Sequence, residues 1–271
     1  MYEPSAKDVM MLRNKTGLPM MACKAALIEA TGDLEKAEEL LRKQLKGKME
    51  SRTDRTAGEG RVAIAVGNGA ASIIEFRAET DFTAKNEKFV AAAQKMADEV
   101  LKSGSTGPVD ATPAINALVE DLKISTGENC SYARGHRLTA AAGETFGYYI
   151  HHDGKTAVLI KASGSITPES IKQIGMHVTA AVPRPQGITA DDIPPAIVEK
   201  ERKFRIDQAI ESGKPKEIAE KMVEGGMKKF FAEIALLEQP FVVDPSKTVK
   251  EIVGSGAKIH QFIRWQVGEQ A

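Results

Sequence analysis

The sequence predicts an α+β protein, and three patterns support that prediction. Short helices with clear start and stop signals open the chain, a strand-turn-strand pattern occurs twice, and a charge-rich helical hairpin interrupts the second half. These patterns divide the 271 residues into a helical domain at 1–47, a linker at 48–60, a core subdomain N at 61–145 and a core subdomain C at 146–271. The helical hairpin is expected within subdomain C, at about 190–232.

The first 47 residues contain the start and stop signals of three short helices. Ser5 is a capping residue before the first apolar positions, and Thr16-Gly17 ends that helix because glycine tolerates the left-handed conformation common at helix ends. Asp33 is placed to cap the third helix. Residues 48–60 are polar and lack periodicity, so we predict a tether there.

The rest of the chain repeats a hairpin followed by a helix. Two strand patterns flank Asn68-Gly69, a dipeptide that supplies the positive φ angles of a two-residue turn. The same design recurs 85 positions later around Asp153-Gly154. Helix-periodic segments follow at 87–101 and 168–182. We therefore expect a duplicated core.

The helices of the two copies align at an offset of only 80, so the first copy has about five extra residues, at Thr80–Lys85. Loops on a rigid scaffold concentrate binding groups, and Phe82 beside the Asp81 carboxylate would form a tip that enters a pocket on a partner. The alternative is that Thr80 or Asp81 caps the next helix while Phe82 folds onto the core as a staple. Core packing is common to both copies, which favours the tip.

Residues 193–230 contain two charge-rich helical stretches joined by Ser212-Gly213-Lys214-Pro215. This pattern predicts an antiparallel helical hairpin. The hairpin is either a solvated arm that packs only on itself or a protruding surface for a partner. The chain then returns to a last expected strand at 262–267.

Charge and composition narrow the range of partners. Lys plus Arg and Asp plus Glu both number 37, so the net charge is zero and no global basic field attracts nucleic acid or an anionic membrane. No apolar run approaches the roughly 20 residues of a membrane span, and the first residues lack a signal-peptide pattern. We expect a cytoplasmic protein that recognises its partners locally, with Cys23 and Cys130 as reduced thiols.

The sequence contains few motifs that are typical of catalysis. The segment 254–258 lacks the spacing of a phosphate-binding loop, and the five histidines form no metal-binding motif, so we expect no covalent enzyme chemistry, no cofactor and no metal. The adjacent His151-His152 should point to opposite faces of a strand. Tyr132, Arg134 and Arg137 could form an edge for nucleic acid, which keeps a ribosome- or RNA-associated binding protein as the alternative function.

Several motifs stand in order along nearly the whole chain. They are Leu12-Arg13, Thr16-Gly17, Met20 to Leu27, Thr31-Gly32-Asp33, Thr80 to Asn86, Met176-His177-Val178 and Ser212 to Gly225. With these motifs the chain resembles the elongation factor Ts family, the guanine nucleotide exchange factors of elongation factor Tu. The resemblance implies an N-terminal ubiquitin-associated-like helical domain, a duplicated α/β hairpin-helix core and an inserted antiparallel helical hairpin.

The resemblance also implies which residues bind the partner GTPase. It places four consecutive residues near the magnesium site of elongation factor Tu, where they dislodge the ion and promote GDP release: Thr80, Asp81, Phe82 and Thr83. It implies further contacts at His151, Met20, Met21 and Lys85. Complexes with two copies of each protein are also compatible with the resemblance.

The chain departs from the family pattern at several positions. Ala22 stands where the family commonly has an acid, and Thr83 replaces a common valine. His152-Asp153-Gly154 makes a slightly different turn after His151. A C-terminal helical extension found in some members is expected to be missing. These departures concern partner contacts rather than the fold.

Overall fold

The computed structural model describes residues 2–50, 54–213 and 215–269, and it mixes helices with strands as predicted. The chain divides into two compact units. Unit 1 comprises residues 1–65, 72–137 and 267–271, whereas unit 2 comprises residues 66–71 and 138–266. Among the described helices, none combines the length and apolar character needed to cross a membrane.

Unit 1 begins with short helices: α1 (Ala6–Thr16), α2 (Met20–Glu29) and α3 (Leu34–Glu50). The Ser5 hydroxyl accepts from the backbone N–H of Asp8 at 3.1 Å, and Gly17 ends α1 with a φ of 74°. The Asp33 carboxylate accepts from two backbone N–H groups in the first turn of α3, at 3.1 Å each. The apolar core of these helices includes Leu12, Cys23, Leu27 and Leu41.

The predicted tether at 48–60 overlaps both of its neighbours. Helix α3 continues to Glu50, and the next strand begins at Glu59. Residues 51–53 lie outside the described part of the chain. Gly60 belongs to the strand, where its backbone approaches that of Phe76 too closely for any Cβ. A glycine that looked like a linker residue therefore serves strand pairing.

One sheet lies mostly in unit 1, and in the described residues its strand order is β1-β2-β4-β3. Its strands are β1 (Glu59–Gly67), β2 (Ala70–Ala78), β3 (Gly107–Pro108) and β4 (Ser131–Thr139). Asn68-Gly69 forms a two-residue turn between β1 and β2, with a φ of 74° at Gly69. Strands β3 and β4 pair in antiparallel orientation.

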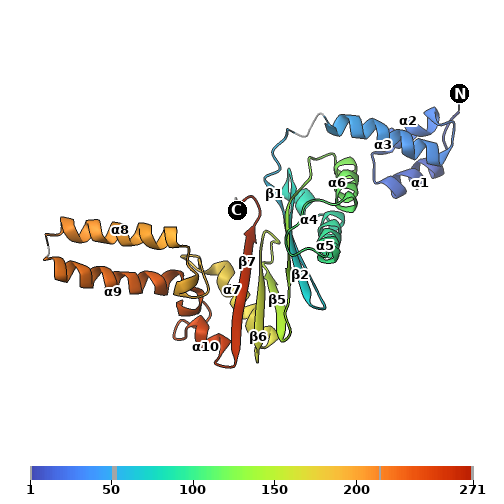
Figure 1. Cartoon of the computed structure of the whole chain (residues 1–271). Helices are drawn as coiled ribbons and strands as arrows, with labels where there is room; N and C mark the ends of the chain where they lie inside the picture. The colour runs from blue at the N-terminus through green and yellow to red at the C-terminus, as the bar shows by residue number, and fades with distance from the viewer. Residues whose placement is uncertain (1, 51–53, 214, 270–271) are drawn as a thin grey trace. The chain divides into compact units, whose positions relative to one another are not determined.

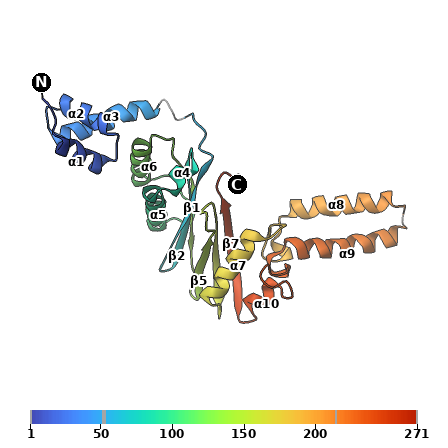
Figure 2. The same cartoon turned by 180° about the vertical axis from the view of Figure 1, so that it is seen from behind.

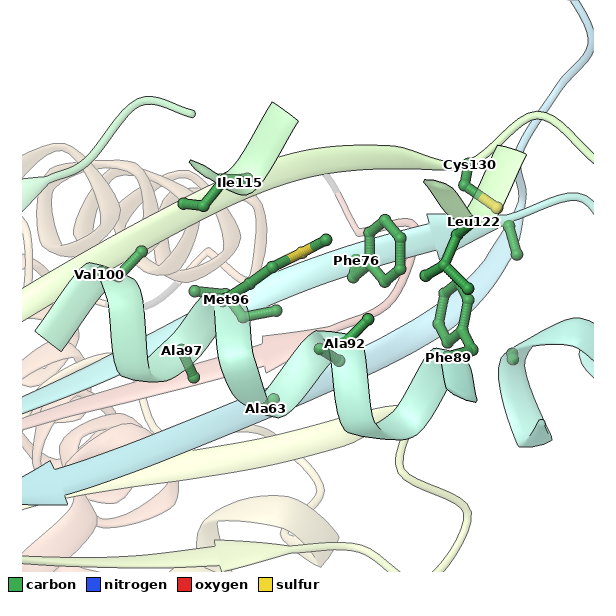
Figure 3. Close-up of a cluster of buried hydrophobic side chains, with 14 of the residues drawn as sticks. Ala63, Phe76, Phe89, Ala92, Met96, Ala97, Val100, Ile115, Leu122 and Cys130 are labelled. Atoms are coloured by element: carbon green, nitrogen blue, oxygen red, sulfur yellow. The ribbon is translucent and has the colours of Figure 1, made fainter. Parts of the chain in front are cut away.

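The helices of this part of unit 1 are α4 (Asp81–Lys85), α5 (Glu87–Lys102) and α6 (Pro113–Thr126). Figure 1 shows α5 and α6 beside the sheet. The rings of Phe76 on β2 and Phe89 on α5 stack with centroids 4.2 Å apart. Figure 3 shows Met96, Ile115 and Leu122 in the same apolar cluster. This core fixes the end of β2 and the start of α5.

Unit 2 contains a second sheet with strand order β5-β6-β7, in which neighbouring strands pair antiparallel. Its strands are β5 (Glu144–Ile150), β6 (Thr156–Gly164) and β7 (Ala257–Gln266). Helix α7 (Pro168–Ala180) packs on this sheet, as Figure 2 shows from behind. The buried core includes Val158, Ile160, Ile174, Val178 and Leu236.

Two long helices follow α7 in unit 2: α8 (Pro195–Glu211) and α9 (Lys216–Ile234). Their shared core contains Ala209, Val223 and Met227. Several large apolar side chains on them remain exposed, namely Phe204, Ile206, Ile210, Ile218 and Met222. The shorter elements are η1 (Ala190–Asp192), η2 (Leu236–Glu238) and α10 (Val249–Val253).

Candidate functional site

The extra residues of unit 1 form a short helix that presents Phe82 to solvent. Thr80 is extended, and its hydroxyl accepts from the backbone N–H of Thr83 at 3.3 Å, which starts α4. Thr83 and Ala84 are buried. Phe82, on the same five-residue helix, is 84% exposed. The segment is therefore anchored by its small residues and exposes its large one.

The structure separates the two interpretations of this segment. Thr80 does cap a helix, but that helix is the short α4, whereas Asn86 caps the expected helix α5. The proposed staple is wrong, because a phenylalanine packed on the core would be buried, and Phe89 of α5 fills that core instead. An exposed ring gains free energy only when another molecule covers it.

Asp81 and Lys85 form an ion pair on the surface of α4. Lys85 Nζ lies 2.6 Å from Asp81 Oδ2, and the two side chains are 65% and 42% exposed. Ion pairs in such exposed positions contribute at most about 1 kcal/mol. The Asp81 carboxylate can therefore exchange Lys85 for a partner group at little cost in free energy.

The residues before α4 are held by the dipeptide Glu128-Asn129. The Glu128 carboxylate accepts from the backbone N–H of Thr80 at 3.1 Å and from its hydroxyl at 2.6 Å. The Asn129 N–H donates to Glu79 at 2.7 Å, and Glu79 also accepts from Arg55 at 3.4 Å. No local signal in the sequence points to this dipeptide, because 48 residues separate Thr80 from Glu128.

Helices α1 and α2 expose flexible apolar side chains. The predicted contacts Met20 and Met21 lie in the first turn of α2 and are 47% and 75% exposed. Met10 and Met11 on α1, which the sequence analysis did not assign, are also about half exposed. Methionine adapts its shape to a partner surface because its side chain is unbranched and polarizable.

The predicted contact His151 lies in unit 2, in the turn between β5 and β6. Its ring centroid is 4.1 Å from that of His152, so the expectation that the two point to opposite faces of a strand is wrong. The physical reason is that β5 already ends at Ile150, and side chains alternate only within a strand.

The turn that carries His151 has its own internal bonds. His151 Nδ1 lies 3.1 Å from Asp153 Oδ1, and that oxygen accepts from the N–H of Lys155 at 2.8 Å. Burial acts to raise the pKa of Asp153, but the hydrogen bonds from Lys155 and His151 outweigh it and hold the pKa below its usual value. Five residues separate the strands, whereas a two-residue turn was expected.

Helix α7 also contains a buried polar side chain, His177, which is held by hydrogen bonds. His177 Nε2 lies 2.9 Å from Gln239 Oε1, and Nδ1 accepts from the N–H of Val242 at 3.2 Å. The ring is therefore neutral and carries its proton on Nε2. Burial lowers the pKa of His177, and the bond to Gln239 opposes that effect only in part.

The three residues of the predicted nucleic-acid edge are engaged within the protein. Arg134 Nε donates to the buried carboxylate of Glu75 at 2.7 Å. The Tyr132 hydroxyl and Arg137 Nε donate to backbone carbonyl oxygens at 2.8 and 2.7 Å. These contacts count against a phosphate-binding role for the set.

Potential metal ligands and thiols of the described residues show no arrangement for metal binding. Within the described ranges, no group of three or more His, Cys, Asp or Glu side chains could hold a metal ion. Cys23 and Cys130 are free and buried, and burial raises the pKa of Cys130 to about 12. A thiol with so high a pKa is a poor nucleophile at neutral pH.

Comparison with known proteins points to one family. The family model described as Elongation factor TS matches residues 79–269. Proteins named elongation factor Ts from Thioalkalivibrio sulfidiphilus, Dinoroseobacter shibae and Vibrio cholerae are 43%, 41% and 40% identical to this chain. The matches cover 98%, 95% and 95% of this chain and 92%, 90% and 89% of those proteins. These similarities define a translation elongation factor. The chain belongs to the elongation factor Ts family.

Proposed function

We propose that this chain is a guanine nucleotide exchange factor for the translational GTPase elongation factor Tu. It promotes GDP release by disturbing the Mg²⁺ and phosphate site of that GTPase. The observation that carries the proposal is the exposed ring of Phe82 beside the Asp81 carboxylate on the anchored helix α4. Membership of the elongation factor Ts family supports the same partner.

Exchange of this kind requires no covalent chemistry. A bound guanine nucleotide is held mainly through its phosphates and Mg²⁺. Phe82 acts as an apolar wedge that enters the GTPase, and Thr80 and Thr83 hold the base of that wedge. Asp81 brings a negative charge beside the metal site and weakens the hold of the ion on the phosphates.

The free energies set how much each contact must supply. By linkage, a factor that weakens nucleotide binding must itself be bound more weakly by the same ratio when nucleotide is present. A thousandfold effect requires about 4 kcal/mol. Burial of Phe82 supplies roughly 1.5 to 3 kcal/mol of that. The remainder comes from distributed contacts at Met20, Met21, Lys85 and His151.

The finer architecture belongs to the same proposal. Residues 1–47 are a ubiquitin-associated-like domain joined by a linker to a duplicated core, with subdomains at 61–145 and 146–271. The paired helices α8 and α9 are an inserted hairpin at about 190–232. The protein acts in the cytoplasm through protein contacts, without nucleic acid or membrane. It also assembles with elongation factor Tu into complexes that contain two copies of each of the two proteins.

The decisive experiment mixes the purified chain with elongation factor Tu that carries fluorescent GDP. Stopped-flow fluorescence should show GDP release that accelerates with the concentration of the chain. Calorimetry of the chain alone with GDP and Mg²⁺ should be flat, because the sequence offers neither a phosphate loop nor a carboxylate cage. Unchanged GDP release, or micromolar GDP binding by the chain alone, would overturn the proposal.

A further inference from the structure

We propose that Glu128 is a positioning residue for partner binding, and that its neighbour Asn129 assists it. This inference rests on the proposed function, since it concerns how Asp81 and Phe82 are presented to the GTPase. Helix α4 has five residues, and helices shorter than about 12 residues are marginal in water by themselves. Contacts from outside α4 must therefore hold the exposed ring in place.

Glu128 determines how the cap of α4 works. The Thr80 hydroxyl has a single proton, and that proton is donated to Glu128 Oε1 over a short distance of 2.6 Å. The hydroxyl oxygen is thereby left to accept from the N–H of Thr83 at 3.3 Å. The second carboxylate oxygen accepts from the Thr80 backbone at 3.1 Å. One ionised side chain thus orients both the backbone and the capping hydroxyl of the same residue.

Asn129 holds the adjacent residues. Its backbone N–H donates to Glu79, which immediately precedes Thr80, at 2.7 Å. Its side-chain Nδ2 donates to the carbonyl oxygen of Arg55 at 2.7 Å, and Asn129 is buried. Glu128 and Asn129, which follow each other between α6 and β4, therefore hold Thr80 and Glu79, which follow each other just before α4. They also fix Arg55, which lies between α3 and β1.

The consequence is a pre-organised wedge. Phe82 is exposed while the start of its helix is restrained by ionic hydrogen bonds, so less conformational freedom is lost when the ring is buried by the GTPase. Without Glu128 the same ring would remain exposed but its helix start would be free to move. Glu128 therefore affects exchange through Thr80, without touching the GTPase.

The test is a double-mutant cycle in the full chain. Glu128→Gln keeps the volume of the side chain but removes the charge, and its NH₂ group replaces one of the two acceptor oxygens that face the donors of Thr80. We expect about a tenfold lower exchange rate constant, as for the loss of one hydrogen bond to a charged group, and a melting temperature that is lower by only a few degrees. In a background that carries both Asp81→Ala and Phe82→Ala, Glu128→Gln should have no further effect on exchange or on binding of the GTPase.

Matched variants test whether the slower exchange of Glu128→Gln reflects only a general loss of structure. Glu99→Gln, on α5, changes the same charge elsewhere and should leave exchange unaltered. Thr80→Val removes the hydroxyl at constant shape and should imitate Glu128→Gln, whereas Thr80→Ser should retain most activity. If Glu128→Gln does not fold, the Thr80→Val and Thr80→Ser pair decides the question in the same way.

Three results would overturn the inference. In the first, Glu128→Gln lowers the exchange rate by the same factor in the unaltered chain and in the chain with Asp81→Ala and Phe82→Ala. That result would show that Glu128 does not act through these two residues. Normal exchange by Glu128→Gln and Thr80→Val, while Phe82→Ala is slow, would remove the positioning role but leave the proposed function standing. Normal exchange by the chain with both Asp81→Ala and Phe82→Ala would refute the proposed function itself, and the inference with it.

Discussion

The connections that lead from the hairpins β1-β2 and β5-β6 to the helices α5 and α7 differ in length by five residues. Between the end of β2 and the start of α5 there are eight residues, 79–86, whereas only three, 165–167, lie between β6 and α7. Thr167 is sufficient to cap α7, since its hydroxyl accepts from the N–H of Ser170 at 3.0 Å. Asn86 does the same for α5, accepting from Lys88 at 2.9 Å. The longer connection is therefore not required to start a helix.

The helices themselves differ in what they bury. Met96 and Ala97 of α5 are both fully buried and apolar, whereas the matching positions of α7 are Met176 and His177. At these two positions α5 thus presents only apolar side chains to its core, while α7 presents a histidine that is bonded to Gln239. The two units therefore differ in where a residue outside this apolar pattern lies, since Phe82 is exposed in unit 1 and His177 is buried in unit 2.

The largest expected effect separates Phe82 from Phe89. Phe82→Ala should slow GDP exchange roughly 10- to 100-fold, because burial of its ring is lost, and should cost the free protein less than about 1 kcal/mol. Phe89→Ala should cost about 3 to 5 kcal/mol of stability, because it leaves a cavity in the core. Stopped-flow exchange and chemical denaturation measure the two effects. A Phe82→Ala protein that melts early but exchanges normally when folded would make Phe82 a core residue.

The next effect separates the two side chains of the exposed tip. Asp81→Ala should slow exchange more than it weakens the complex, because its charge acts at the metal site while Phe82 drives insertion. Rate constants of exchange and dissociation constants of the nucleotide-free complex, measured on the same preparation, give the ratio. Equal losses in both quantities would mean that Asp81 contributes only to binding.

A smaller effect tests the buried histidine of unit 2. Burial lowers the pKa of His177 below 6.5, so at mildly acidic pH the unfolded chain binds a proton that the folded chain refuses. Above pH 6.5 the ring is neutral in both states and costs no stability. The free energy of unfolding then falls as the pH drops from 6.5 towards the lowered pKa of the folded state. Denaturation between pH 7.5 and about 5 should show a shallower pH dependence for His177→Gln than for the unaltered protein. His152→Gln, at an exposed position, serves as the control, and parallel curves for His177→Gln and the unaltered protein would contradict the assignment.

The smallest effect concerns the turn of unit 2. His151→Ala should weaken the complex severalfold, about 1 kcal/mol, with little change in melting temperature, and His152→Ala should do less. Titration of each variant with nucleotide-free elongation factor Tu provides the comparison. Loss of stability in His151→Ala without a binding defect would assign the ring to its local bond with Asp153.

Local signals predicted much of the fold. Ser5, Gly17 and Asp33 act at helix ends, and Asn68-Gly69 turns a hairpin, because each interaction spans only a few residues. Strand β4 and helix α6 were not assigned. The segment 131–139 lacks the alternation of apolar and polar residues that is typical of a strand, and it becomes a strand by pairing with partners remote in the chain.

Some features of the candidate site could likewise be predicted from the sequence, and others depended on the fold. The residues Asp81 and Phe82 were found from their types and from the length of their connection, and family resemblance supplied His151, Met20 and Met21. That Phe82 is exposed and that Thr80 is held by Glu128 required the tertiary structure. A capping residue or a turn is settled by its neighbours in sequence. Burial and hydrogen-bond partners are settled by segments 48 or more residues away, which only folding brings together.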